Sequence, residues 1–168
     1  MKYFCFIVLF GTLLASFTGC GTCPSCQHKE EVATFKKRSI NPWTWQDNRG
    51  FVQANEVTGG QRMLFTAGQV SVDKDGHLLH PGDMEKQIHQ VMDNMETLLQ
   101  QADFDLANVV RFTYYTTDVA AFTKVNVEKQ VLMKRLKKAG CTPATSLIGV
   151  NALFHPDCLV EIEATVVD

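Results

Sequence analysis

Apolar and polar residues alternate loosely along residues 51–57 (FVQANEV), which is the pattern of a half-buried strand. Thr58-Gly59-Gly60-Gln61 follows as a turn sequence, and residues 62–70 have the composition of a strand that returns beside the first. Ala67-Gly68-Gln69 interrupts this second strand, and a glycine within a strand indicates a bulge or the close approach of another group. The pattern therefore predicts a β-hairpin over residues 51–70.

A helical period replaces the alternation after Asp83. Apolar side chains recur every three or four residues from Met84 to Leu99, as in a helix with one buried face. Asp83 is a favourable N-cap, and Glu85 complements the positive end of the helix dipole. Three of the six methionines lie on this stripe, and we expect them to fill the core rather than to form a pliable binding groove. His89 lies off the stripe and is expected in solvent.

A strand and a second helix come next. Residues 109–117 are rich in β-branched and aromatic residues, and Asp118 is placed to cap a helix that runs to about Ala139, where Gly140 ends it. Four basic residues crowd the last turns of this helix: Lys134, Arg135, Lys137 and Lys138. An anion site is one interpretation, but cations favoured by the helix dipole on a solvated face are the interpretation we prefer.

Two further strands, residues 144–150 and 159–167, close the pattern. If they form a hairpin centred near Phe154, Cys158 and Cys141 lie about nine residues apart along it, or roughly 30 Å at ~3.3 Å per residue. A disulfide requires Cα atoms within about 7 Å of each other. We therefore predict that both thiols are free.

The N-terminus has the pattern of a targeting segment. Residues 3–17 are apolar and uncharged, too short a run for a membrane span of about 20 residues but of the length of a signal-peptide core. The run ends at Ser16-Phe17-Thr18-Gly19-Cys20, which resembles a bacterial lipoprotein cleavage site with Cys20 as the lipidated residue, although Phe17 stands where Leu is usual. A plain secretory signal is the alternative. Either interpretation predicts a protein of the bacterial cell envelope, lipid-anchored or periplasmic.

We therefore expect three parts: a leader over residues 1–19, a tether over residues 20–40 and a folded domain over residues 41–168. The tether is polar and charged, as a spacer is. It contains Cys23 and Cys26 as a C-x-x-C pair, but the strand and helix that flank a redox pair are missing, and lipidation of Cys20 leaves too few zinc ligands. We expect a disulfide or an idle pair there, and no metal or cofactor.

Composition narrows the function classes. The chain of 168 residues has 16 basic and 18 acidic side chains, a formal charge of −2 and a sequence pI near 6.2. Nucleic-acid binding through phosphates usually produces a basic excess, so no nucleic acid is expected as a partner.

Several short motifs follow one another along the predicted domain: Ala67-Gly68-Gln69-Val70, Gly82-Asp83, Ala107-Asn108-Val109-Val110-Arg111, Thr116-Thr117-Asp118, Phe122 with Val125-Asn126, Pro143-Ala144, and Val160-Glu161-Ile162-Glu163-Ala164. In their order and spacing they resemble the motifs of the RidA (YjgF) family of reactive-intermediate deaminases. The resemblance implies an α+β domain of the chorismate mutase-like or ferredoxin-like type, with element order ββαβαββ. It also implies a homotrimer with a ligand cleft between subunits.

The resemblance further implies the residues of the cleft. Active family members hold an Arg after the Pro-Ala motif, which grips a substrate carboxylate, and a Glu on the last strand that positions water. Glu161 matches the Glu, but Pro143-Ala144 is followed by Thr145 and Ser146, so the Arg is absent. Phe51 replaces a family Tyr on the first strand, and two more residues match pocket or support positions: Gly68 and Asn126.

The missing Arg leaves three functional hypotheses. The first is a RidA-like protein that binds a small metabolite, with altered or lost deaminase chemistry because Thr145 cannot copy a bidentate grip. The second is an enamine or imine deaminase whose anion clamp has moved, with Arg49, Arg62 and Arg111 as candidates. The third is a nuclease, for which neither a basic groove nor an acid–base set is visible. Trp43 and Trp45 either line the cleft mouth or cover a sheet edge or subunit contact.

Overall fold

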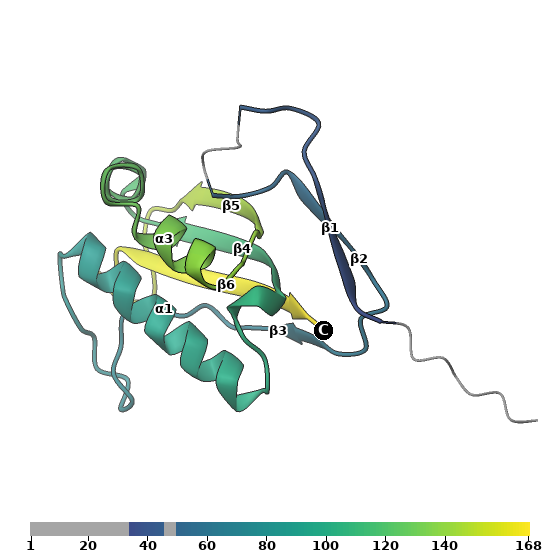
Figure 1. The fold of residues 1–168 in the computed structure, drawn as a ribbon. Coiled ribbons are helices and arrows are strands. Elements are labelled where there is room, and N and C mark those ends of the chain that lie inside the picture. The colour runs from purple at the N-terminus through teal and green to yellow at the C-terminus, as the bar shows by residue number, and fades with distance from the viewer. Residues whose placement is uncertain (1–33, 46–49) are drawn as a thin grey trace, which may run out of the picture. The chain divides into compact units, whose positions relative to one another are not determined.

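The computed structural model describes residues 34–45 and 50–168 (Figure 1). The predicted leader, the lipidation site at Cys20 and the C-x-x-C pair lie outside these residues, as does Arg49. Among the helices that are described, none combines the length and the apolar character needed to cross a membrane.

A mixed sheet of four strands forms the centre of the domain, in the order β3-β6-β4-β5. β6 (Val160–Val167) is antiparallel to both neighbours, β3 (Met63–Phe65) and β4 (Val109–Thr116), whereas β5 (Ala144–Gly149) is parallel to β4. β1 (Lys36–Ile40) and β2 (Ala54–Thr58) form a separate antiparallel ribbon. The α+β class predicted from the sequence is confirmed.

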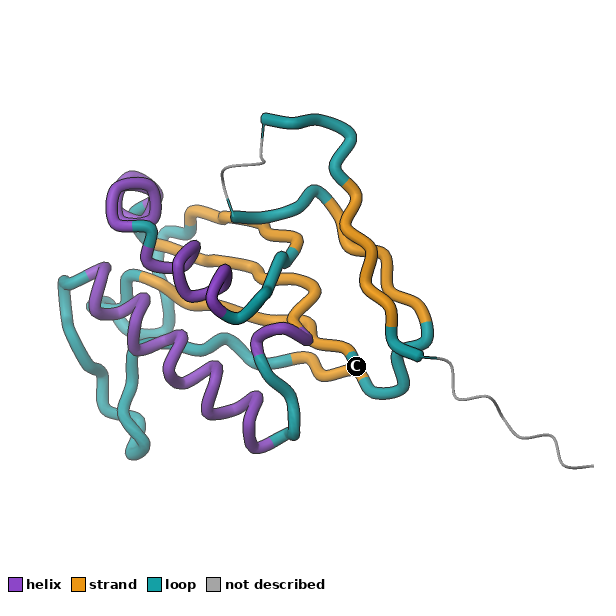
Figure 2. Tube along the Cα trace, in the orientation of Figure 1, coloured by secondary structure: helices purple, strands orange, loops and turns teal. Residues whose placement is uncertain are grey.

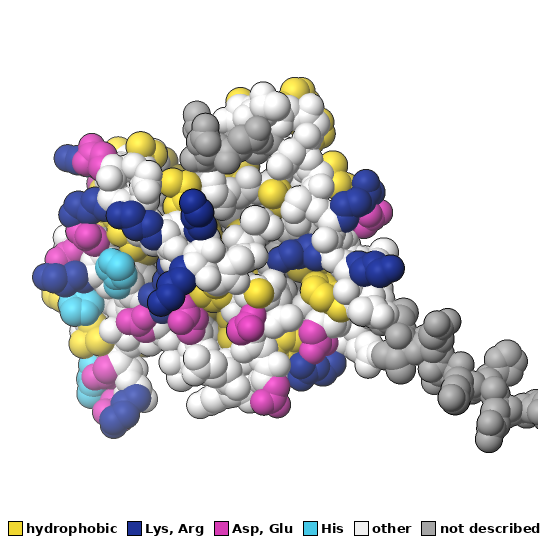
Figure 3. Space-filling view, viewed as in Figure 1, with side chains coloured by type: hydrophobic (Ala, Val, Ile, Leu, Met, Phe, Trp, Pro, Cys, Tyr) yellow, Lys and Arg dark blue, Asp and Glu magenta, His cyan; other side chains and the backbone are white. Residues whose placement is uncertain are grey.

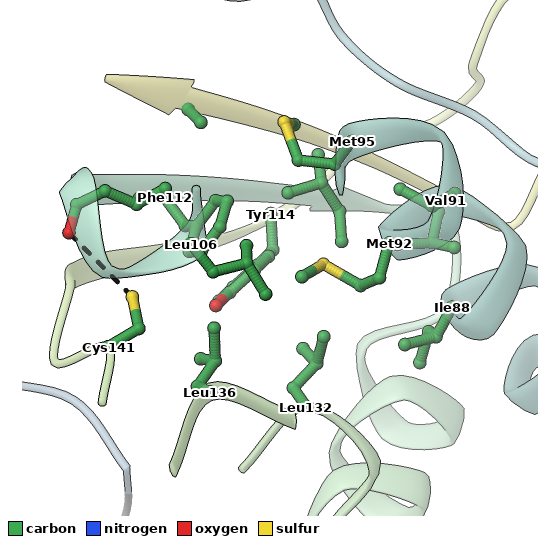
Figure 4. Close-up of a cluster of buried hydrophobic side chains, with 14 of the residues drawn as sticks. Ile88, Val91, Met92, Met95, Leu106, Phe112, Tyr114, Leu132, Leu136 and Cys141 are labelled. Carbon is green, nitrogen blue, oxygen red and sulfur yellow. Dashed lines mark hydrogen bonds between the residues drawn. The ribbon is translucent and has the colours of Figure 1, made fainter. Parts of the chain in front are cut away.

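Helices cover one face of this sheet (Figure 1). α1 (Met84–Gln101) and α3 (Val131–Lys138) are the two longest, and the others are a 3₁₀ turn, η1 (Leu106–Asn108), and α2 (Val119–Lys124), which continues as a π-helical segment, η2 (Val125–Lys129). Figure 4 shows side chains of α1, α3 and β4 meeting in one apolar cluster between helices and sheet. Close packing of such a layer is the main source of stability for a domain of this size.

The helix predicted from the apolar stripe after Asp83 is confirmed as α1. The Asp83 side chain accepts a hydrogen bond from the Lys86 backbone N–H, as the predicted N-cap should. Met92 and Met95 are 1% and 0% exposed, so the methionine stripe fills the core, and His89 is exposed.

The second helix is not continuous as predicted. α2 passes into η2, the chain takes a left-handed conformation at Gln130 with φ of 56°, and α3 then begins. Figure 2 shows the helical coil before α3 almost end-on, while α3 itself runs across the view. The break lets α3 turn its apolar side chains, such as Leu132 and Leu136, onto the sheet.

The predicted hairpin of residues 51–57 with 62–70 is wrong. β2 pairs with β1, which the sequence analysis had placed in the tether, and β3 pairs with β6. Two side chains fasten this ribbon to the domain: Lys37 Nζ donates to the Ala107 carbonyl at 2.9 Å, and Asn55 Nδ2 donates to the Val110 and Thr142 carbonyls at 2.9 Å each.

The predicted hairpin of the last two strands is also wrong, because β4 pairs with both of them and they do not pair with each other. The prediction about their cysteines is nonetheless confirmed, since Cys141 and Cys158 are free and buried. The Cys141 thiol lies 3.8 Å from the Val109 carbonyl (Figure 4), and burial raises its pKa to about 11.

Candidate functional site

The sheet has a second face that carries polar side chains, which we call the open face. On β4, Phe112, Tyr114 and Thr116 point toward the helices and are buried. Side chains alternate along a strand, so the residues between them, Thr113 and Tyr115, belong to the open face. Their β6 partners are Glu163 and Glu161 respectively, which places both glutamates on the open face as well.

Glu161 lies against Gly68. The segment after β3 passes beside β6, where the Gln69 N–H donates to the Ile162 carbonyl at 2.9 Å and the Ile162 N–H donates to the Gln69 carbonyl at 3.0 Å. A Cβ atom added at Gly68 would lie 1.7 Å from Glu161 Oε1. The carboxylate therefore occupies the space that any other residue type at position 68 would need.

Glu163 is held by Tyr115, whose hydroxyl donates to Glu163 Oε2 at 3.1 Å. This hydrogen bond is the main reason that the pKa of Tyr115 is raised. Partial burial, followed by the nearby Glu163, raises the pKa of Glu161. A carboxylate with a raised pKa accepts a proton more readily than a free carboxylate does, as a group that takes a proton from water should.

Ser146 shares the open face, but Thr145 does not. In the parallel pairing of β5 with β4, Ser146 is the partner of Thr113 and Thr145 is the partner of Phe112. Thr145 therefore lies on the helix side of the sheet, and Glu161 lies on the opposite side. Both β5 residues are half-buried.

Phe51 also lies on the helix side. The Val52 N–H next to it donates to the Pro143 carbonyl at 3.1 Å, and Phe51 lines a hollow of about 670 Å³ together with residues of α3. Its ring meets the Trp45 ring edge-on, with centroids 6.0 Å apart. Trp43 and Trp45 are 60% and 57% exposed, so in one subunit both remain largely accessible.

Asn126 supports the fold of the helical layer. Its Nδ2 donates to the Phe122 carbonyl at 3.1 Å, and its Oδ1 accepts from the Leu132 backbone N–H at 3.3 Å. The side chain thus joins α2 to α3 across the π-helical segment.

The arginines proposed to replace the missing clamp differ in their surroundings. Arg62 is engaged by Asp168 and stacks over the Phe104 ring at 4.3 Å. Arg111 is exposed and pairs with Thr165 on β6, four residues along the strand from Glu161. Arg111 and Tyr115 are four positions apart on β4, so their side chains lie on the same face of the sheet. Arg111 therefore shares the open face with Glu161, the β6 partner of Tyr115.

Tyr115 is a residue of the open face that the sequence analysis did not single out. The alternation within residues 109–117 contained the signal, because a strand whose Phe112, Tyr114 and Thr116 are buried presents Thr113 and Tyr115 on its other face. Knowledge of β6 as the neighbouring strand was needed to link Tyr115 with Glu163.

Among the described residues, three lie close enough together to hold a metal ion: Asp73, Asp75 and His77. Asp73 Oδ1 already accepts the backbone N–H groups of Asp75 and His77 at 2.9 Å each, so this group closes a turn.

Comparisons with known proteins support the resemblance seen in the sequence. The model of the endoribonuclease L-PSP family matches residues 48–168. A RutC family protein of Pasteurella multocida is 34% identical over 118 residues, covering 70% of this chain and 86% of that protein. A 2-iminobutanoate/2-iminopropanoate deaminase of Escherichia coli is 29% identical over 106 residues, covering 62% of this chain and 79% of that protein.

Solved structures show the same fold. A Rid family protein of Yersinia pestis has a TM-score of 0.68 and 34% identity, covering 79% of this chain and 98% of that one. Escherichia coli TdcF, solved with bound serine, has a TM-score of 0.56 and 25% identity, covering 77% of this chain and 91% of that one.

Proposed function

Because the chain belongs to the endoribonuclease L-PSP family, which includes the RutC and Rid (YjgF) proteins, we propose that it binds a small metabolite in a cleft between subunits of a homotrimer. Its deaminase chemistry is altered or lost, because Thr145 stands where active members carry Arg. The bound serine of TdcF supports a small ligand of this kind. No cofactor is required.

The observation that carries the proposal is the contact of Glu161 with Gly68 on the open face. Sequence resemblance links these residues with Phe51, which one subunit places on the opposite side of the sheet. Docking of a second copy on the open face would bring helix-side residues of one subunit toward Glu161 of another. The division of the candidate residues between two faces therefore supports a cleft that needs two subunits.

Exposed apolar side chains on the open face support the same assembly. Met63 and Phe65 on β3 are the partners of Val167 and Thr165, and they are 60% and 70% exposed. Ile148 on β5 is the partner of Tyr115 and is 41% exposed. Large exposed apolar side chains that border polar ones are typical of protein–protein interfaces.

Release of ammonia from freshly generated 2-iminopropanoate tests the proposal. We expect no acceleration over spontaneous hydrolysis by the wild type, and a gain of roughly tenfold to a few hundredfold in Thr145→Arg, from one or two charged hydrogen bonds. Glu161→Gln in that background should abolish the gain, since the amide cannot accept a proton from water. Thr123→Arg, an exposed position on α2, controls for added charge.

The second candidate is a true enamine or imine deaminase with a relocated clamp, and the raised pKa of Glu161 favours it. Under this function the wild type itself releases ammonia, and Glu161→Gln removes that activity while Thr145→Arg adds little. An inactive wild type, together with a Thr145→Arg protein that has a lower melting temperature and no activity, would contradict both kinds of deaminase chemistry and leave a binding protein.

We also propose attachment to the cell envelope through Cys20. Metabolic labelling with a radioactive fatty acid should mark the wild type and leave Cys20→Ser unlabelled. Unlabelled wild type recovered from the cytoplasm would exclude the anchor and the envelope location together.

A further inference from the structure

The hollow beside Phe51 is formed by the loop that enters β2 and by one side of α3. Its apolar wall includes Phe51, Met133 and Leu136. Gly50, with φ of +74°, packs so closely on Met133 that an added Cβ would lie 2.7 Å from Met133 Cγ. This contact joins the loop to the helix. The volume of about 670 Å³ is within the range of small-molecule sites.

Two lysines line the hollow, Lys134 and Lys137, and none of the other described residues that line it is an Asp or Glu. Neither lysine forms an ion pair with another residue of the described chain. Figure 3 shows several Lys and Arg side chains over this helical region of the surface, with Asp and Glu side chains among them.

A second hollow on the other side of α3 has the opposite character. It is lined by Arg135 and Lys138 but also by Asp93, Glu96 and Asp105. Arg135 donates to Asp93 and Glu96 at 2.6 Å each. The basic residues at the end of α3 therefore divide into two that line a hollow together with carboxylates, Arg135 and Lys138, and two that line a hollow whose described residues include no Asp or Glu, Lys134 and Lys137. The helix dipole explains why cations occur in this turn, but it does not explain why the described residues that line one of the two hollows include no Asp or Glu.

We propose that the hollow between Phe51 and α3 binds a small organic anion with an apolar body, such as an arylacetate. Lys134 and Lys137 hold its carboxylate, and Phe51, Met133 and Leu136 contact the apolar part. This site is on the helix side of the sheet and does not use Glu161 or the open face of the same subunit. It shares Phe51 with the proposed cleft, and Lys134 and Lys137 are residues that the cleft proposal does not include. Of the four basic residues that the sequence analysis considered as an anion site, the proposal uses two, Lys134 and Lys137.

Binding of three matched ligands to the full-length protein tests the site: phenylacetate, its neutral analogue phenylacetamide, and the cation 2-phenylethylammonium. The two tryptophans of the chain report binding by fluorescence because Trp45 contacts Phe51, and calorimetry measures the affinity. We expect phenylacetate to bind at least about tenfold more tightly than phenylacetamide, as charged hydrogen bonds to a carboxylate require, and the cation to bind most weakly. Added salt should reduce the difference.

Lys134→Gln/Lys137→Gln should lower the affinity for phenylacetate to that of the amide, and Lys138→Gln, on the same helix but facing the other hollow, should leave it unchanged. Circular dichroism establishes that each variant is folded. Equal affinities for anion and amide in the wild type, absence of binding, or a preference for the anion that survives the double substitution would each overturn the proposal.

Discussion

At the scale of single residues, the contact between Gly68 and Glu161 determines which side chains both positions accept. The Glu161 carboxylate fills the volume beside the Gly68 Cα. Because Gly68 has no side chain, Glu161 can adopt this conformation. The glycine was recognisable in the sequence as a site of close approach. Its partner was not, because residues 68 and 161 are far apart in the chain and meet only through the pairing of Gln69 with Ile162.

Gly68→Ala should displace the Glu161 side chain and lower the free energy of unfolding by about 1–3 kcal/mol, the usual cost of overpacking. Urea unfolding measures this cost. In a Glu161→Ala background the same substitution should cost much less, because the clash with the carboxylate is removed. An equal cost in both backgrounds would show that backbone strain at position 68, rather than Glu161, is responsible.

The stability of the protein should depend on pH through Glu161. Burial and Glu163 raise the pKa of this carboxyl in the folded state, so the folded protein binds the proton more tightly than the unfolded chain does. The contribution of Glu161 to stability therefore improves as pH falls from neutral through that raised pKa.

Glu161→Gln should accordingly be more stable than the wild type at pH 7, and the advantage should disappear below the unfolded-state pKa of about 4.3, where the wild-type side chain is also neutral. Unfolding by urea at several pH values measures the difference, with the exposed Glu128→Gln as control. An advantage that grows toward pH 4 has the wrong sign and would contradict the assignment.

At the scale of elements, the sequence predicted helices and strands better than it predicted strand partners. The period of 3.6 residues identified α1 and its cap, since burial of one helix face leaves a strong pattern. Alternation in residues 51–57 contains no information on the identity of the neighbouring strand, and β1 was hidden by the charge of Lys36, Lys37 and Arg38. Their side chains are tolerated because the ribbon is largely exposed.

The pairing of β5 had a signal that the hairpin prediction overlooked. A strand, a helix and a second strand in succession usually form a parallel unit, and β4, α2–α3 and β5 are such a unit. The connection from β5 to β6 is also longer than the two to five residues typical of hairpins. The π-helical segment had no comparable signal: Val125, Asn126 and Val127 are weak helix formers, but such residues also occur in regular α-helices.

Asn126 is the residue that stabilises this break. Asn126→Ala should lower the free energy of unfolding by about 1–3 kcal/mol, because the Leu132 N–H and the Phe122 carbonyl lose their side-chain partners. Thermal or urea unfolding measures the loss, and Thr123→Ala, an exposed neighbour, is the matched control. Equal stabilities of Asn126→Ala and the control would show that water replaces the amide at no cost.

At the scale of the whole molecule, the open face of one subunit combines the half-buried carboxylates of Glu161 and Glu163 with exposed apolar residues. Such a face is expected to be covered in an assembly. The solved Rid-type structures show that the fold is shared, and the homotrimer is our proposal for how that face is covered.

Light scattering should give the mass of a trimer at micromolar concentration. Phe65→Lys should dissociate it, because a charge would replace a side chain that is 70% exposed on the open face. Val127→Lys is the control, since Val127 is similarly exposed, at 68%, but lies in the helical layer. A wild type that is monomeric, or a trimer that survives Phe65→Lys and not Val127→Lys, would remove the intersubunit cleft.

The central position of β6 has a consequence for biosynthesis. This strand joins β3 to β4, yet it is the last of the described elements to be translated. While the ribosome is still adding residues 117–159, β3 and β4 have no strand between them, and the apolar faces of β4 and α1 cannot complete their packing. Sheet assembly must therefore wait until synthesis has passed β6. Export before folding, which the proposed leader would require, is compatible with this order of synthesis, because the sheet cannot be completed until β6 has been made.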